Sequence, residues 1–515
     1  MTTTQTQTVH ELLSSGAAGA VAIGAQERPS LTFHGLRRLV RDTVVSLNQL
    51  GYGRGDAIAI VLPNGPEMAT AFVAVAAACV SAPLNPAYRG EEFAFYLADL
   101  QAKALIVDAG SESPAIEEAR KQGVPIVELV ADKGGPAGLF TLRGPDGQIV
   151  VPADGAMPDY AQPEDVGLIL HTSGTTSRPK QVPLRHRNLA ASARHIGGVL
   201  GLTADDRCMN IMPLFHIHGL IAATLSSLAA GGSVFCTPGF NALRFFAQLD
   251  EAHPTWYTAV PTMHQAILTR ADRNPESIAR NPLRLIRSSS ASLPPQVMAQ
   301  LEATFDAPVI ESYGMTEAAH QMASNLLPPR ARKPGSVGVA AGPEVGIMDD
   351  AGELLEPGDT GEVVIKGPNV TAGYVNNDKA NAEAFTNGWF RTGDQGYLDA
   401  EGYLWLTGRL KEIINRGGEK ISPREIDEVL LDHPAVAQVC TFAMPHDKLG
   451  EDVAAAVVLV EGIAPPSERD LRDFCAGRLA DFKVPRKVVI LSEIPKGATG
   501  KIQRIGLAEK LCLGK

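Results

Sequence analysis

Residues 166–180 read Val-Gly-Leu-Ile-Leu-His-Thr-Ser-Gly-Thr-Thr-Ser-Arg-Pro-Lys, a short apolar run followed at once by a loop rich in hydroxyl groups. The run is typical of a buried strand, and in α/β proteins the loop after such a strand commonly holds a ligand. The loop combines hydroxyls, a glycine and a cation: Thr172, Ser173, Gly174, Thr175, Thr176 and Lys180. Hydroxyls and backbone N–H groups donate to phosphate, and an ammonium offsets its charge. We therefore predict a polyphosphate site.

The alternative is an ordinary polar turn. The loop also lacks the Walker pattern, because Pro179 stands where that pattern needs its second glycine. The loop alone does not decide between these interpretations.

Outward from this loop, apolar runs alternate with stretches of helical periodicity through the first three-quarters of the chain. Strand-like runs occupy residues 57–62, 104–107, 125–130, 233–236, 255–259, 283–287 and 308–311, and helical spacing marks 36–50 and 91–100. This alternation predicts parallel sheets flanked by helices. The alanine-rich stretch 68–84 is short for a membrane span, and we expect a buried helix that runs into a strand.

After about residue 335, glycine turns separate short strands at 361–366, 388–393 and 402–408, which predicts a small antiparallel β region. Residues 423–431 have a helical pattern, and strands are expected at 436–442, 453–459 and 488–491. The fold expected is α/β, with a large N-terminal domain at 1–410 and a small α+β domain at 411–515.

The composition is that of a globular protein. The 515 residues are 45% hydrophobic and 20% charged, with a net charge of −11 and dispersed basic residues, which argues against nucleic acid as a partner. Six scattered cysteines lack metal-ligand spacing and are expected to be reduced, mostly buried thiols. The N-terminal residues do not match a secretory signal and the C-terminal residues do not match a peroxisomal one, so the expectation is a cytoplasmic protein without a membrane partner. The oligomeric state stays open.

Four further motifs follow the loop in order. They are Glu311-Ser-Tyr-Gly-Met-Thr-Glu317, Gly388-Trp-Phe-Arg-Thr-Gly-Asp394, Gly408-Arg-Leu-Lys-Glu-Ile-Ile-Asn-Arg-Gly-Gly-Glu-Lys420 and Pro495-Lys-Gly-Ala-Thr-Gly-Lys501. In order and spacing the chain resembles the adenylate-forming superfamily of acyl-CoA synthetases, peptide-synthetase adenylation domains and luciferases. The resemblance covers nearly the whole chain. It implies an N-terminal domain of layered αβαβα sheets with a β-barrel-like region, and a mobile C-terminal domain.

Within that superfamily the chain is most similar to oxalate–CoA ligases of plants and fungi. The stretches that carry this similarity are residues 171–180, 214–219, 255–261, 287–293 and 316–320. One position departs from the pattern, because Gln181 stands where most relatives have glycine. A side chain there would shift the loop or restrict its flexibility.

The resemblance implies roles for individual residues. The loop 172–176 and Lys180 would hold the β- and γ-phosphates of ATP, Thr316 would contact the α-phosphate, and Glu317 would ligate Mg²⁺. The adenine slot would be formed by Ser290, Ala291, Glu311, Ser312 and Tyr313. Asp394 would accept the ribose hydroxyls, and Arg409 would contact ribose or phosphate. Taken singly, Asp394, Glu317 and Lys501 also fit a turn residue, a helix cap and a solvated lysine.

The resemblance also implies a two-step reaction with ATP, Mg²⁺ and coenzyme A. A hinge at Lys411 would let the C-terminal domain first present Lys501 to the α-phosphate and the acid. It would then present Gly417, Gly418 and Lys420 to the thiol of coenzyme A. The catalytic candidates are Lys501, Thr316, Glu317 and His216.

The choice of acid is a separate inference. A small dicarboxylate keeps one carboxylate that needs buried donors, and His216, His218, Ser290 and His320 are the candidates because all can hydrogen-bond an anion. A further histidine, His264, fits a structural role as well as it fits a role in the site. Malonate, a fatty acid or an aryl acid is the alternative substrate. A non-catalytic nucleotide-binding protein is the alternative class, and a peptide-synthetase module or a luciferase-like oxidase is less favoured.

Overall fold

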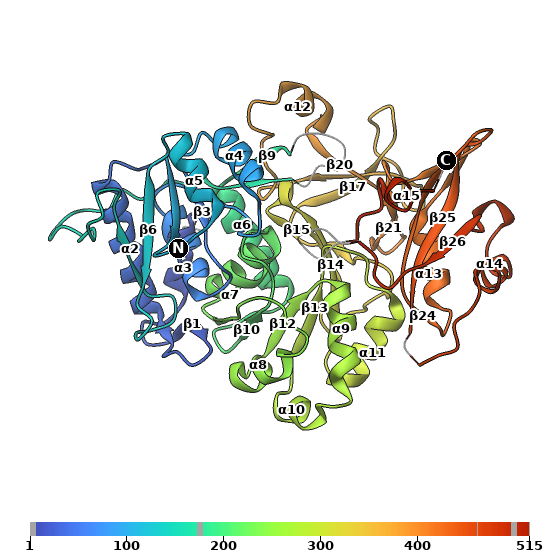
Figure 1. Ribbon diagram of the computed structural model, residues 1–515, viewed down its shortest axis with the longest axis horizontal. Coiled ribbons are helices and arrows are strands. Elements are labelled where there is room, and N and C mark those ends of the chain that lie inside the picture. Colours follow the sequence, from blue (N-terminus) through green and yellow to red (C-terminus); the bar gives the residue numbers. More distant parts are fainter. Residues whose placement is uncertain (1–6, 173–178, 461, 496–501, 514–515) are drawn as a thin grey trace. The chain divides into compact units, whose positions relative to one another are not determined.

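The computed structural model describes residues 7–172, 179–460, 462–495 and 502–513. Two compact units make up the chain. The first comprises residues 1–333, 338–344 and 366–384, and the second comprises 334–337, 345–365 and 385–515. Both are shown as a ribbon in Figure 1, and each is described by itself.

A seven-stranded sheet in the first unit is parallel except at its edges. Its order is β7-β6-β5-β3-β4-β8-β9, and β7 and β9 pair antiparallel with their neighbours. The strands are β3 (Ala57–Val61), β4 (Val80–Pro83), β5 (Ala104–Asp108), β6 (Ile126–Ala131), β7 (Phe140–Arg143), β8 (Val166–His171) and β9 (Gln181–Arg185). Strand β8 leads directly to the hydroxyl-rich loop, as predicted.

A nine-stranded sheet, in the order β16-β15-β14-β13-β12-β10-β11-β1-β2, lies in the same unit. Its six central strands are parallel: β1 (Val21–Ala25), β10 (Arg207–Asn210), β11 (Ser233–Cys236), β12 (Trp256–Ala259), β13 (Leu285–Ser288) and β14 (Val309–Met315). Antiparallel strands close its edges: β2 (Leu31–Thr32), β15 (His320–Ser324) and β16 (Val339–Ala340).

Helices cover these sheets in layers. Apolar side chains of α4 (Gly90–Asp99) and α5 (Pro114–Lys121) pack on the seven-stranded sheet, and those of α8 (Phe245–Ala252), α9 (Pro261–Ala271) and α11 (Pro295–Phe305) pack on the nine-stranded sheet. Between the sheets lie α3 (Pro66–Ala76) and α6 (His186–Val199), each of which contacts both. The predicted αβαβα layering is confirmed, and the stretch 68–84 is a buried helix followed by β4.

Further helices and turns complete this unit. They are α1 (Val9–Leu12), α2 (Phe33–Gln49), α7 (Ser226–Ala229), α10 (Pro275–Arg280), α12 (Asp378–Ala384), the 3₁₀ turns η1 (Leu13–Ser15) and η3 (Thr316–Ala318), and a π-helix, η2 (His218–Leu225). The π-helix was not predicted, and all eight of its residues are buried.

The second unit contains two small sheets. The first joins β17 (Glu344–Met348), β18 (Gly361–Lys366), β19 (Phe385–Thr386), β20 (Trp389–Leu398) and β21 (Leu404–Arg409), with antiparallel pairs around β20. The second joins β22 (Ile414–Arg416), β23 (Glu419–Ile421), β24 (Val436–His446), β25 (Gly450–Leu459) and β26 (Lys487–Ile490). Its helices are α13 (Pro423–Leu431), α14 (Glu468–Ala476) and α15 (Leu507–Lys510), with the turn η4 (Asp481–Lys483).

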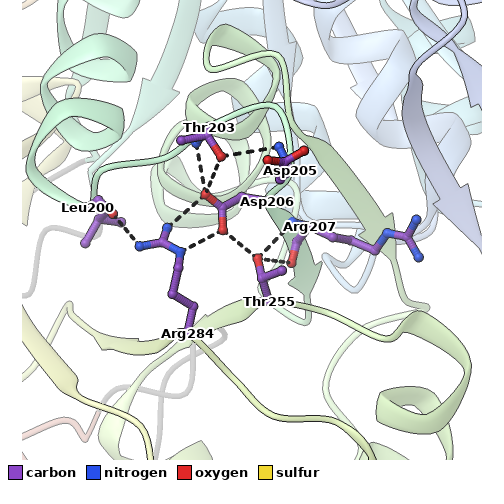
Figure 2. A network of polar contacts seen from close by, with 7 residues as sticks. All are labelled: Leu200, Thr203, Asp205, Asp206, Arg207, Thr255 and Arg284. Carbon is purple, nitrogen blue, oxygen red and sulfur yellow. Dashed lines mark hydrogen bonds and ion pairs between the residues drawn. The ribbon is translucent and has the colours of Figure 1, made fainter.

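An ionic network braces the amino edge of the nine-stranded sheet (Figure 2). Asp206 precedes β10 and accepts two bonds from Arg284, which precedes β13, with Nε–Oδ1 at 2.8 Å and Nη2–Oδ2 at 2.9 Å. Thr255, before β12, donates to Oδ1 at 2.7 Å. Burial alone would raise the pKa of Asp206, but these bonds and the Thr203 N–H lower it. The segments that enter three strands are therefore held together at the edge opposite their carboxyl ends.

All six cysteines are free thiols, and five of them are buried, with Cys512 exposed. Among the described residues, no helix combines the length and the apolar character that crossing a bilayer requires.

Candidate active site

Polar side chains gather where the parallel strands of the nine-stranded sheet end, and many of them are buried. His218, at the start of η2, is fully buried. Its Nε2 lies 2.6 Å from Thr258 Oγ1, on β12, and its Nδ1 lies 3.1 Å from Ser290 Oγ, just after β13. Two of the four residues predicted to bind the acid, His218 and Ser290, are thus in direct contact.

Arg287, on β13, joins this cluster and is itself completely buried. Its Nη2 donates to Gln321 Oε1 at 3.1 Å, and lies 3.5 Å from Nδ1 of His320, a third predicted residue. The rings of His218 and His320 are 5.0 Å apart between centroids. Burial lowers the pKa of Arg287 to about 9, so the guanidinium keeps its charge at neutral pH. A buried cation therefore lies among the predicted donors.

The backbone at this cluster adopts conformations that side chains rarely take. Ser290, Ala319 and His320 have positive φ angles of 74°, 48° and 99°. Gly314 permits the arrangement, because a Cβ there would lie 1.5 Å from the His320 carbonyl oxygen across the β14–β15 pair. Non-glycine residues held at positive φ cost free energy and concentrate at functional sites. The strain supports a functional role for this edge of the sheet.

His216, the fourth predicted acid-binding residue, lies beside the cluster. Its Nδ1 accepts the backbone N–H of His218 at 3.2 Å. Since Nδ1 is the acceptor, a neutral His216 carries its proton on Nε2. The contact places His216 next to the start of the π-helix, a helix type that is frequent at functional sites.

The residues predicted to form the adenine slot follow β13 and lie within β14. Tyr313 is buried, and Ala291 is exposed. The side chains of Glu311 and Ser312 point into the protein: Glu311 Oε1 accepts the Leu293 N–H at 2.9 Å, and Ser312 Oγ contacts Ser324 Oγ at 3.0 Å. Glu311 thereby anchors the turn that carries Ser290 and Ala291, a positioning role that sequence reasoning did not assign.

Glu317, predicted to ligate Mg²⁺, is buried in the turn η3 next to the half-buried Thr316. Its Oε1 accepts the hydroxyl of Tyr374 at 2.9 Å. Lys180, from the phosphate loop, lies over the Tyr374 ring with its Nζ 4.0 Å from the centroid. Burial and the Glu317 carboxylate raise the pKa of Tyr374, so the phenol stays a donor. One carboxylate supplemented by phosphate oxygens is a donor set that suits Mg²⁺. Tyr374 therefore contacts both Glu317 and Lys180.

Both ends of the phosphate loop are tied down. Thr172 N–H donates to the Lys180 carbonyl at 2.9 Å, and Lys180 N–H donates to Thr172 Oγ1 at 3.2 Å. Asp99, at the end of α4, contacts both flanks: its Oδ2 lies 2.9 Å from His171 Nε2 and 2.9 Å from Gln181 Nε2. Gln181 thus fastens the loop base to α4. The predicted residues Ser173, Gly174, Thr175 and Thr176 lie outside the described residues.

The second unit holds the other predicted residues. Arg409 Nε donates to Asp394 Oδ1 at 3.0 Å across β20 and β21. Gly417 and Gly418 have φ of 61° and 103° in the two-residue turn between β22 and β23, where positive φ favours glycine. The turn alone therefore accounts for both glycines. Lys411 and Lys420 are exposed, and Lys501 lies outside the described residues.

Five residues of these sites were not predicted: Asp99, Thr258, Arg287, Gln321 and Tyr374. The sequence could have indicated Arg287, because a cation is unusual within a strand that is expected to be buried and often marks a functional site. The others had no such signal, since their roles depend on contacts between segments far apart in the chain. His264 is fully buried, with Nδ1 3.2 Å from Tyr257 Oη, and burial lowers its pKa to about 3, which fits a structural residue.

Comparison with known proteins adds to this geometry. Residues 14–375 match the model of the family described as AMP-binding enzyme, and residues 425–501 match that of the AMP-binding enzyme C-terminal domain. The chain is 46% identical to an oxalate–CoA ligase of Arabidopsis thaliana, over 94% of each protein. It is 45% identical to an oxalate–CoA ligase of Saccharomyces cerevisiae, over 88% of this chain and 87% of the relative. Among solved structures, ATP-bound MatB from Rhodopseudomonas palustris matches with a TM-score of 0.86 and 29% identity, over 98% of each chain.

Proposed function

The chain belongs to the AMP-binding enzyme family, and on that basis we propose that it is an ATP-dependent ligase that joins oxalate to coenzyme A. The products are oxalyl-CoA, AMP and diphosphate. The acid–CoA ligase activity is supported by the relatives that match along nearly the whole chain. The identity of the acid rests on their names together with the buried polar cluster of this chain.

The chemistry proceeds in two displacements. A carboxylate oxygen of the acid attacks the α-phosphorus of ATP, the bond to diphosphate breaks, and an acyl-adenylate forms. The thiol sulfur of coenzyme A then attacks the acyl carbon, the thiol gives up its proton, and the bond to AMP breaks. The protein's task is to position these groups and to stabilise the developing charge. When bound, Mg²⁺ offsets phosphate charge that would repel the incoming carboxylate.

Residues of the first unit would serve the first displacement. We propose that Lys180 and the hydroxyl-rich loop hold the phosphates, that Thr316 contacts the α-phosphate, and that Glu317 holds Mg²⁺. Tyr374 keeps the Glu317 carboxylate oriented through its hydroxyl, and its ring supports Lys180. Ser290, Ala291 and Tyr313 would line the adenine slot, with the turn anchored by Glu311.

Residues of the second unit would complete the reaction. We propose that Asp394 and Arg409 bind the ribose, that Lys501 approaches the reacting carboxylate, and that Gly417, Gly418 and Lys420 serve the thiol step after rotation at Lys411. The compact units do not coincide with a boundary at 410/411, and a hinge is a property of two conformations, so this hinge stays a prediction. A cytoplasmic location is likewise a proposal.

One observation carries the choice of acid: the buried cluster of His218, Ser290, Arg287 and His320 at the carboxyl edge of the sheet. A fatty or aryl acid needs an apolar pocket, and a cluster that is polar and carries a guanidinium charge disfavours such a ligand. A small acid with a second anionic end matches the polarity and the charge of the cluster.

The test is a panel of acids supplied with ATP, Mg²⁺ and coenzyme A to the purified full-length protein. AMP release is measured, and the thioester is identified by mass. We expect oxalate to give the highest kcat/KM, with oxalyl-CoA as product. A higher kcat/KM for malonate, a fatty acid or an aryl acid would reject oxalate, and no AMP release with any acid would reject the ligase itself.

A further inference from the structure

The buried polar cluster contains a cation for which the described part of the chain supplies no anion. Arg287 is fully buried, and its Nε has no hydrogen-bond partner. Among the residues that the structure describes, no carboxylate pairs with Arg287; its side chain contacts Thr258, His320 and Gln321, none of which is an acid. A buried charge without a counter-charge is costly, and proteins rarely retain one.

The hydrogen bonds around Arg287 restrict how protons are placed on its neighbours. A guanidinium only donates, so Nδ1 of His320, 3.5 Å from Arg287 Nη2 and at the outer limit for a hydrogen bond, is an acceptor. Thr258 Oγ1 accepts from Arg287 Nη1, also at 3.5 Å. When Thr258 donates its hydroxyl proton to His218 Nε2, at 2.6 Å, His218 carries its own proton on Nδ1 and donates it to Ser290 at 3.1 Å.

This arrangement is complete with a single proton on each of the two rings, whereas the positive charge of Arg287 does not depend on how those protons are assigned. Hydrogen bonds from these side chains do not by themselves offset a full negative charge, and the Nδ1 proton of His218 is already given to Ser290. Arg287 supplies the formal positive charge of the cluster. Its position on β13, three residues before Ser290 and next to His320, places that charge among the residues expected to meet the acid.

We propose that Arg287 is the counter-charge for the second carboxylate of the acid and selects a dianionic substrate over a monoanion of the same shape. The inference rests on the proposed function and extends it to a specificity-determining residue. It explains why a cation persists in the core of a parallel sheet, where an apolar residue would otherwise be favoured.

Oxamate tests the charge directly on the wild-type protein. It has the size and planarity of oxalate, but an amide replaces one carboxylate, so one negative charge is absent. The affinity of a ligand that relies on a buried charge pair falls about 30-fold or more when one charge is removed. We therefore expect the inhibition constant of oxamate, as a competitor of oxalate, to exceed the oxalate KM at least about tenfold. Equal affinities for oxalate and oxamate would overturn the inference, whatever happens to any variant.

The Arg287→Gln variant then tests whether Arg287 is the source of the charge preference. Arg287→Met is a second variant, used if the first does not fold. Each should raise the oxalate KM by about 30-fold or more, leave the ATP KM within about twofold, and abolish the preference for oxalate over oxamate. A purely structural role would change stability or both KM values but would keep that preference. A preference retained in a folded variant would therefore overturn the proposal.

The proposed function and the proposed role of Arg287 fail in different experiments. If the proposed function is wrong, wild-type protein releases no AMP in response to oxalate. If only the role of Arg287 is wrong, oxalate turns over normally and the oxalate-to-oxamate preference is absent or independent of Arg287.

Discussion

The Tyr374 hydroxyl offers a sharp test of the proposed magnesium site. It donates to Glu317 Oε1 at 2.9 Å, and the two residues are 7% and 5% exposed, so water does not readily replace the bond. A hydrogen bond to a charged group contributes about 1.5–3 kcal/mol. Outer partners of a metal ligand typically change metal affinity by about 10–100-fold. Tyr374→Phe should therefore raise the Mg²⁺ concentration for half-maximal activity by roughly 10–100-fold.

The assay measures oxalate-dependent AMP release against Mg²⁺ at one fixed ATP concentration for every protein. The Phe variant keeps the aromatic face under Lys180, so its ATP affinity at saturating Mg²⁺ should stay near that of the wild type. Tyr374→Leu removes the ring as well and should weaken ATP binding by a further factor of about 2–30, the range expected of a cation–π contact.

Tyr88→Phe is the matched control, because the Tyr88 hydroxyl bonds another tyrosine, Tyr96, at 3.4 Å. It should leave the Mg²⁺ dependence unchanged. If Tyr374→Phe matches this control, Tyr374 does not position the metal carboxylate, and the reasoning is refuted.

Three further outcomes are expected. Lys501→Ala should lose adenylate formation yet retain thioester formation from presynthesised oxalyl-adenylate. The two half-reactions are measured separately, and equal loss of both would count against two orientations of the C-terminal domain. Gln181→Gly should raise the ATP KM about 2–10-fold, because it removes the two hydrogen bonds from Gln181 Nε2 that tie the loop base to Asp99. An unchanged ATP KM would show that these bonds do not contribute to ATP binding. Asp206→Asn should destabilise the fold by about 2–3 kcal/mol in urea at pH 7. Since the pKa of Asp206 is lowered in the folded state, the stabilisation that its carboxylate provides is lost as pH falls. The difference in free energy of unfolding between wild type and variant should therefore shrink below about pH 4. A difference that does not depend on pH would contradict the role of that ion pair.

Much of the fold was predictable because its elements have strong local patterns. Strand β5 (Ala104–Asp108) and helix α13 (Pro423–Leu431) match the expected ranges closely, since an apolar run and a helical periodicity mark them without ambiguity. Strand β15 (His320–Ser324) was not predicted. It reverses direction after a turn with two residues at positive φ, which a local pattern does not indicate.

The candidate site was predictable in its chemistry and less so in its geometry. Residues such as His218 and Ser290 were identified as partners of one acid, and they do touch. Tyr374 and Thr258 escaped detection because each acts through a contact with a residue more than 35 positions away. Arg287 appeared in the sequence analysis only as part of a motif, without a role of its own. Its role is inferred from its burial and from the absence of an acid partner among the described residues.

The most direct test of the central claim is the incorporation of labelled diphosphate into ATP by the purified protein, with Mg²⁺ and oxalate but without coenzyme A. Reversible adenylation predicts exchange that depends on oxalate and proceeds without the thiol. Absence of exchange with oxalate and with every other small acid would contradict the account.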